Sequence, residues 1–357
     1  MNKRRRVSIV VAGFVVALAA SCATQHLTLW TAPAPVRVSG ASFSGWGPNA
    51  DVWDPVRVAS RTVALSAEDT SINAVGKLVY RGGLVLQSDD ARFGGLSGLH
   101  VEADGRLVAV TDKGHWFVAR LTHSEAGELT GVVDARMAAL RGVGGEALRR
   151  KEDADAEEVV RLSDGRFAVS FERSHAIRLY DLEADGPEAA AEKEIALSGV
   201  EPLKANESLE SLALLDDGLV TAGEGVTNRN PPFWIVPLAP ETPPAPAGRA
   251  TTKDFYGLVA LARAPDGDYI AMERFFAPIL GVRIHLRRVT RASIDAGRWE
   301  GETIADLAPP VGVDNFEGLA VVPGADGAVR LYLISDDNFN DSQRTLLYAF
   351  DLKEERS

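Results

Sequence analysis

Carboxylates recur at equivalent places in five segments of the 357-residue chain. Each segment has an apolar run, a turn containing glycine and a second apolar run that leads into an acid. The acids after the second runs are Asp112, Glu172, Glu224, Glu273 and Asp336. Three segments place another acid at the first run: Glu158, Glu210 and Glu317. Carboxylates gathered in one place are the ligands that hard divalent cations prefer, Ca²⁺ above all.

In a hydrolase, which is what a family resemblance described below implies, such a cation would polarise an ester oxygen and lower the pKa of a bound water. The predicted Ca²⁺ ligands are Glu158, Glu210, Glu317 and Asp336. The predicted catalytic residues are Glu172 or Glu224 as general base, with Arg173 and Arg274 holding an anionic group of the substrate. The alternative is that the acids only cap turns, pair with arginine or face solvent.

The segments themselves indicate β-hairpins. They cover Phe93–Gly114, Asp155–Ser174, Asn206–Val226, Phe255–Phe275 and Asn315–Asn340, and in each an Asp precedes the turn glycine. Asp-Gly between apolar runs is a strong hairpin signal, because the turn needs a positive φ. The segments start about 50 to 60 residues apart, which is typical of propeller blades with four strands each.

A sixth blade is expected from Val56–Leu86, closed by Arg344–Leu352 returning beside it. The prediction is therefore an all-β, six-bladed β-propeller, rather than one with seven blades, forming a single domain over residues 56–357. One short helix is expected within Gly144–Val160. Because equivalent residues of successive blades converge on the axis, we expect the acids to meet at one mouth of the channel.

The N-terminal segment has the pattern of an export signal. Four basic residues within Met1–Arg6 precede the apolar run Val7–Ala20, which is short for a membrane span. Cys22 is the only cysteine and follows small residues, as in a bacterial lipobox. We predict a signal peptide over residues 1–22, lipidation of Cys22 and a tether over residues 23–55. The chain would be an exported lipoprotein, periplasmic or at the cell surface. Cleavage after Ala23 is the alternative.

The amino-acid composition narrows the classes of ligand and partner that the chain could bind. Lys and Arg total 38 against 50 Asp and Glu, a net charge of −12, which argues against nucleic acid and suits a cationic ligand. At 46% hydrophobic residues the chain can bury a large core. We expect a monomer that contacts the membrane through its lipid anchor and takes a small-molecule ester as substrate.

Several motifs resemble the bacterial phytase-like domain, often called esterase-like activity of phytase. They are "GLSGL" and "VAVTDKG", then "DAEEVV", "FAVSFER" and "ESLESLAL", and finally "NFEGLAVV" with "YLISDDNFNDSQRTLLYAF". The resemblance covers most of residues 75–352 and is most specific at Ser335–Phe339, Gln343 and Arg344–Leu346. It implies a propeller and hydrolysis of phosphate or carboxylic esters. The chain departs from the family pattern at Val159, where glycine is common, and at Gly257, where an acid is expected.

Three hypotheses follow. The first is an exported, metal-dependent hydrolase of phosphate or carboxylic esters with an acidic axial site. The second is a non-catalytic envelope propeller that binds a ligand or a protein partner, since no nucleophile motif is recognisable. The third is a Ca²⁺-dependent lactonase similar to the paraoxonase or gluconolactonase type, which also places Ca²⁺ on a six-bladed axis.

Overall fold

The computed structural model describes residues 46–47, 52–201, 203, 208–225, 230–324, 327–340 and 342–353. The chain separates into two units, Met1–Gly40 and Ala41–Ser357, and every described residue belongs to the second. The predicted signal peptide with Cys22 and most of the predicted tether lie outside the described residues. Among the residues that are described, no helix has the length and apolar character needed to cross a membrane.

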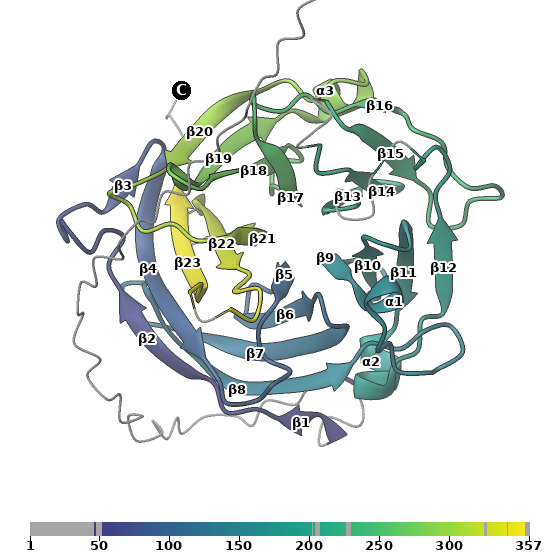
Figure 1. Ribbon diagram of the computed structural model, residues 1–357, viewed down its shortest axis with the longest axis horizontal. Coiled ribbons are helices and arrows are strands. Elements are labelled where there is room, and N and C mark those ends of the chain that lie inside the picture. The colour runs from purple at the N-terminus through teal and green to yellow at the C-terminus, as the bar shows by residue number, and fades with distance from the viewer. Residues whose placement is uncertain are drawn as a thin grey trace, which may run out of the picture. The chain divides into compact units, whose positions relative to one another are not determined.

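Nearly all regular structure in the described residues belongs to five antiparallel sheets, called blades one to five here (Figure 1). From its inner strand outward, blade one contains β5 (Leu96–Val101), β6 (Arg106–Thr111), β7 (His115–His123), β8 (Leu129–Ala139) and β1 (Asp54–Pro55). Blade two contains β9 (Ala156–Arg161), β10 (Phe167–Phe171), β11 (Ala176–Tyr180) and β12 (Lys193–Ala196). Blade three contains β13 (Ser211–Leu215), β14 (Gly218–Ala222), β15 (Pro232–Val236) and β16 (Gly248–Arg249).

Blade four contains β17 (Gly257–Arg263), β18 (Tyr269–Ala277), β19 (Gly281–Val289) and β20 (Gly301–Leu307). Blade five contains β21 (Phe316–Pro323), β22 (Val329–Ser335), β23 (Thr345–Leu352), β4 (Leu78–Gln87) and β2 (Ala59–Val63), with β3 (Ala74–Val75) beside β4. The described helices are short: α1 (Lys151–Ala154), α2 (Leu182–Asp185), α3 (Arg291–Asp295) and the 3₁₀ turn η2 (Gly186–Glu188). Helix α1 lies where the sequence predicts one.

The predicted hairpins are present. In blade one the turn between β5 and β6 is closed by a 2.9 Å hydrogen bond from the Gly105 amide to the Glu102 carbonyl. Gly105 has a φ of 84°, and Gly165 at the same place in blade two has a φ of 98°. Residues other than glycine rarely adopt such positive φ angles, so the Asp-Gly pairs correctly identified the turns.

The blades form a closed ring, because each inner strand contacts the next: β5 contacts β9, β9 contacts β13, β13 contacts β17, β17 contacts β21, and β21 contacts β5. Five clusters of buried apolar side chains lie between neighbouring blades of the described residues, one at each blade interface. Strands such as β10 and β14 are buried along their whole length because both faces of a blade pack against a neighbour. This packing supplies most of the hydrophobic stabilisation.

The all-β propeller prediction is confirmed, but the sixth blade is not. Residues 56–86 do not form a sheet of their own. Instead, β4 pairs antiparallel with β23, with Leu84 opposite Leu347, and β2 pairs with β4. An isolated edge of β23 would leave a row of unpaired backbone groups, and β4 covers it. The predicted pairing of the N-terminal strands with residues 344–352 is therefore correct, while those strands belong to blade five.

We expect the pairing of β4 with β23 to be a main determinant of stability. Leu84 is fully buried in the cluster between blades one and five. Leu84→Ala should lower the free energy of unfolding by about 2–5 kcal/mol through lost burial and the cavity left behind. Leu280→Ala is the matched control, since Leu280 is 54% exposed and its truncation should change stability by less than about 0.5 kcal/mol. Urea denaturation of both variants checks this; equal losses would contradict it.

Candidate functional site

An extra residue in the inner strands turns side chains toward the axis. Four inner strands leave one residue unpaired between two ladder pairs: Ser97, Glu157, Val259 and Glu317. Such a β-bulge bends the strand and re-aims the extra side chain. Glu210 holds the same place in blade three, directly before β13. Three of the five bulge positions therefore carry a glutamate.

The residue that follows the second strand completes the pattern in each blade. In four blades its amide donates to the carbonyl of the residue that leads into the inner strand. These hydrogen bonds are Asp112 to Gly95 (2.9 Å), Glu172 to Asp155 (2.9 Å), Glu224 to Ser208 (3.1 Å) and Asp336 to Asn315 (3.0 Å). In blade four the equivalent residue is Arg274, which pairs with Gly257. The five blades thus contribute four carboxylates and one guanidinium from this position.

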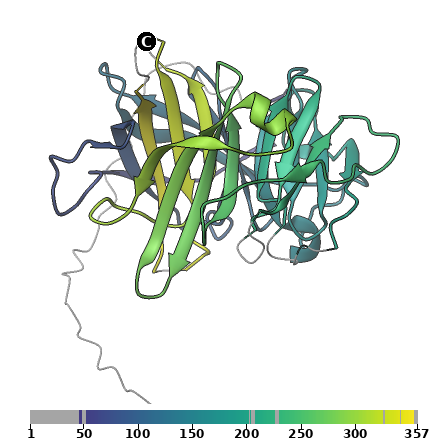
Figure 2. The same ribbon diagram turned by 90° about the horizontal axis from the view of Figure 1, so that it is seen from above.

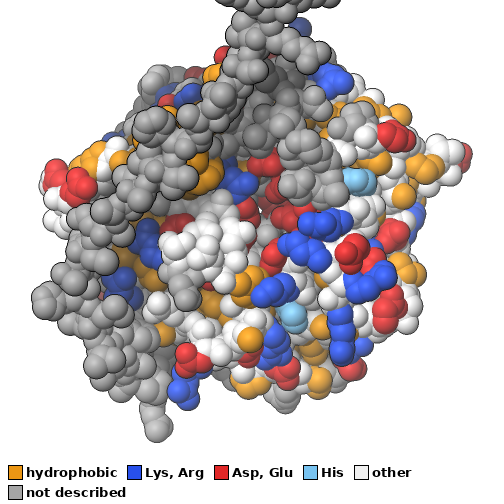
Figure 3. Space-filling view, viewed as in Figure 1, with side chains coloured by type: hydrophobic (Ala, Val, Ile, Leu, Met, Phe, Trp, Pro, Cys, Tyr) orange, Lys and Arg blue, Asp and Glu red, His pale blue; other side chains and the backbone are white. Residues whose placement is uncertain are grey.

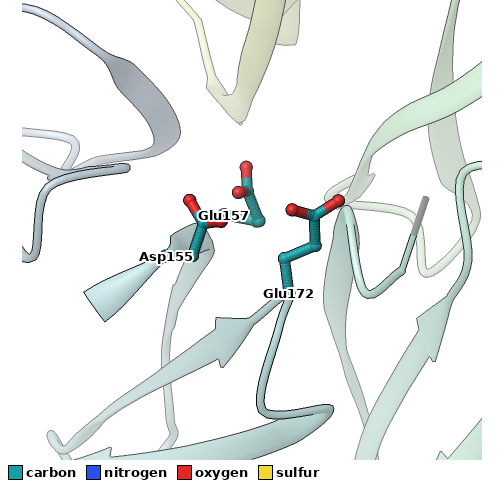
Figure 4. A group of neighbouring side chains, drawn as sticks. All are labelled: Asp155, Glu157 and Glu172. Carbon is teal, nitrogen blue, oxygen red and sulfur yellow. The ribbon is translucent and has the colours of Figure 1, made fainter. Parts of the chain in front are cut away.

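We call the resulting set the axial acid group: Asp112, Asp155, Glu157, Glu172, Glu210, Glu224, Glu317 and Asp336. Its tightest part is in blade two, where carboxylate oxygens of Asp155, Glu157 and Glu172 all lie within 4.8 Å of one another (Figure 4). All three side chains are at most 8% exposed. Acidic side chains gather near the centre of the face seen in Figure 3, with lysine and arginine beside them.

Three basic residues contact the axial acid group among the described residues. Lys151 of α1 lies 2.9 Å from both Asp112 and Asp155, and Arg173 lies 2.7 Å from Asp155. Arg274 reaches Glu224 at 3.1 Å and also pairs with Glu317. Eight carboxylates against three cations leave an excess of negative charge in a largely buried place, which is costly unless protons or a metal ion compensate it.

The pKa values of the group show this cost. Burial raises the pKa of Glu172 to about 7, and the charge of Asp155 adds to the effect. Burial, together with the charge of Glu317, raises the pKa of Asp336 to about 8. The pKa values of Glu157 and Glu210 are raised well above the usual range by burial and then by neighbouring carboxylates. Without a metal ion, part of the group therefore keeps its protons at neutral pH.

Ser208 holds three of these acids in place. Its carbonyl accepts hydrogen bonds from the amides of Glu210 (2.8 Å) and Glu224 (3.1 Å), and its amide donates to the carboxylate of Glu172. Its hydroxyl lies 2.5 Å from Nδ1 of His175. Sequence reasoning missed Ser208, because nothing in "NESLE" distinguishes a serine that anchors three acids from an ordinary loop serine.

The structure places three of the four predicted metal ligands, Glu210, Glu317 and Asp336, in the axial acid group. It does not bring Glu158 there. The Glu158 carboxylate accepts from the amides of Leu99 (3.1 Å) and Val159 (2.9 Å), so it joins blade two to blade one. The adjacent residue Glu157 lies in the axial acid group instead. The bulge shifts the register by one residue, and sequence alignment of the blades could not show that shift.

The predicted catalytic residues Glu172, Glu224, Arg173 and Arg274 all lie in or against the axial acid group. Glu273 was expected on the axis but does not lie in or against this group. It is fully buried and pairs with Arg287 at 2.5 Å, and it accepts from the amide of Lys253 at 2.8 Å. The reason is again a register shift, because Arg274, not Glu273, is the residue equivalent to the strand-end acids of the other blades.

A family model described as "Phytase-like: Esterase-like activity of phytase" matches residues 91–339. Comparison with curated proteins gives no match. Among solved structures, the chain is similar to the α-L-arabinofuranosidase PaAbf62A from Podospora anserina in complex with cellotriose, at 9% identity and a TM-score of 0.49, covering 78% of this chain and 98% of that one.

Two other solved structures are also similar. A putative 6-phosphogluconolactonase from Bacteroides uniformis ATCC 8492 has 14% identity and a TM-score of 0.35, covering 85% of this chain and 84% of its own. The calcium-binding protein regucalcin from Agrobacterium tumefaciens str. C58 has 13% identity and a TM-score of 0.37, covering 76% of this chain and 80% of its own.

The raised pKa values predict how stability depends on pH when divalent ions are removed. Between the unfolded pKa of about 4 and the folded values of about 7 for Glu172 and about 8 for Asp336, the folded state binds more protons than the unfolded state. Stability should therefore fall as pH rises from 5 to 8. Thermal unfolding in EDTA measures this fall, and the double variant Glu172→Gln/Asp336→Asn should reduce it. A melting temperature that rises across this window in the parent protein would refute the assignment.

Proposed function

Because the family model covers more than half of the chain, the chain belongs to the phytase-like family, and we propose that it is an exported hydrolase of phosphate or carboxylic esters that uses Ca²⁺ at the axial acid group. The single observation that carries the proposal is the excess, among the described residues, of the eight carboxylates of this group over the three basic residues that contact them. A divalent cation with many oxygen ligands would offset that excess.

The donor set fits a hard cation. Carboxylate oxygens are the ligands that Ca²⁺ takes, and three of them already lie within 4.8 Å of one another at Asp155, Glu157 and Glu172. Oδ1 of Asp112 is buried and has no hydrogen-bond partner among the described residues, as expected for an oxygen that faces a cation. We assign the ion to Asp155, Glu157 and Glu172, with Asp112, Glu210, Glu317 and Asp336 as further acids beside it.

The ion and three charged side chains would each have a separate role in hydrolysis. The ion would polarise the ester and lower the pKa of a water. Glu172 would accept a proton from the attacking water through the carboxylate oxygen that does not hold the ion. Arg173 uses Nε to hold Asp155, and its guanidinium is placed to bind an anionic substrate group through Nη. Arg274, bound to Glu224, Glu317 and Asn315, would balance charge and hold those acids in position.

The adjacent residues Glu157 and Glu158 provide a test of the proposed ion site. Glu157→Gln removes one axial carboxylate and should lower Ca²⁺-restored activity by at least about 100-fold, because it weakens the binding of the ion that activates water. Glu158→Gln is the matched control. Its amide oxygen can still accept from Leu99 and Val159, so activity should remain within about threefold of the parent.

The assay would follow hydrolysis of p-nitrophenyl phosphate, p-nitrophenyl butyrate, phytate and a γ-lactone after EDTA treatment, with and without added Ca²⁺. Ca²⁺-dependent turnover of a phosphate or carboxylic ester that Glu157→Gln abolishes supports the proposal. Turnover confined to the lactone would select a lactonase, and no turnover of any substrate would select a non-catalytic binding propeller. Equal loss of activity in both variants would show that the group is structural.

Export is proposed from the N-terminal sequence, in which basic residues, an apolar run and Cys22 follow one another. In a bacterial host the parent protein should fractionate with membranes through lipid on Cys22. Cys22→Ala should move it to the soluble or secreted fraction, or leave it unprocessed. Mass spectrometry of the mature N-terminus measures the result. An unmodified parent chain cleaved after Ala23 would contradict lipidation and support the alternative signal cleavage.

A further inference from the structure

The hairpin that joins β18 and β19 has an unusually apolar end. Between Arg274 and Arg283 the chain reads "FFAPILGV" and carries no charge. Ile279 is 96% exposed, Phe276 67% and Leu280 54%. Large side chains of this kind are rarely so exposed together in a soluble domain. We call residues Phe276–Leu280 the hairpin tip.

The tip stands on the same side of the blade as the axial acid group. Arg274 contacts that group, and β18 continues for three residues beyond it, to Ala277. At about 3.3 Å per residue the tip lies about 10 Å further out. Figure 2 shows the hairpin of blade four extending beyond the neighbouring strands. Phe255, 64% exposed, lies near the base of the hairpin, where Tyr256 packs on Phe275 with ring centroids 5.5 Å apart.

The shape of the tip suits lipid better than protein. A stable protein interface contributes about 800 Å² from each partner, and a narrow tip with a few exposed side chains offers less. Insertion into a bilayer needs apolar side chains and satisfied backbone groups rather than shape complementarity. The Ala277–Gly281 pair closes the ladder at the tip, and Pro278 has no N–H to satisfy. A depth of about 5–10 Å, which interfacial segments reach, matches the length of the tip.

The sequence supports lipid as the partner. Predicted lipidation at Cys22 would keep the domain at a membrane surface, where a second, apolar contact would fix its orientation. The net charge of −12 gives no general attraction to anionic lipids, which favours an apolar contact. We propose that the hairpin tip inserts into a bilayer and turns the mouth of the axial acid group toward the lipid surface.

This inference is independent of hydrolysis and can be tested on residues 41–357, which contain every strand of the five blades. The fragment should co-sediment with vesicles of phosphatidylcholine, and with vesicles containing one quarter phosphatidylglycerol. Binding should persist at 0.5 M salt because it is apolar. Ile279→Ser/Leu280→Ser should weaken it at least about tenfold, with the melting temperature unchanged.

The matched control is Val143→Ser/Ile235→Ser, which removes exposed apolar side chains from the connection between β8 and α1 and from β15, and should leave binding unchanged. Ile279→Trp gives a second readout, since its fluorescence should shift to the blue with vesicles and be quenched by brominated lipid. The proposal is overturned if the parent fragment binds neither vesicle, or if the tip variant binds as well as the parent. It is also overturned if the tip substitutions abolish self-association in sedimentation equilibrium, because a second copy would then cover the tip.

Discussion

The axial acid group depends on the closure of the ring between β4 and β23. Five blades converge on one axis only if the first and last are held together, and here strands from the beginning of the domain complete the last sheet. Once the ring is closed, the positions of the inner strands are set by their neighbours. Carboxylates that would separate in an open sheet are then kept together against their mutual repulsion, by apolar packing at the five blade interfaces.

Charge balance explains how blade four differs from the rest. Four blades place an acid after the second strand, whereas blade four places Arg274 there and Val259 at its bulge. The guanidinium contacts Glu224 and Glu317, one from each neighbouring blade. Blade four therefore contributes a basic side chain that offsets acids of both neighbouring blades, whereas blade two contributes the densest acids together with Arg173.

Much of this architecture could be predicted from the sequence, and the main errors have two causes. Asp-Gly turns between apolar runs identified the hairpins, because backbone geometry restricts that turn chemistry. Repetition of acids predicted their convergence. The bulge was not visible, since one unpaired residue leaves the apolar pattern nearly intact. Glu158 and Glu273 were therefore expected on the axis in the places that Glu157 and Arg274 occupy, although Arg274 was predicted as an anion-binding residue. The blade count failed because an edge strand and an independent blade have the same local pattern.

The bulge itself has a consequence for how such a domain can diversify. A residue outside the ladder can be exchanged without loss of a backbone hydrogen bond, and the five positions already hold serine, glutamate and valine. The strand pairing that builds the propeller can therefore stay unchanged while the residues at the bulge positions vary. Ser97 is a natural starting point for laboratory evolution of metal selectivity, since a new donor atom can be installed there without loss of a backbone hydrogen bond, whereas Val259 belongs to the apolar cluster between blades four and five.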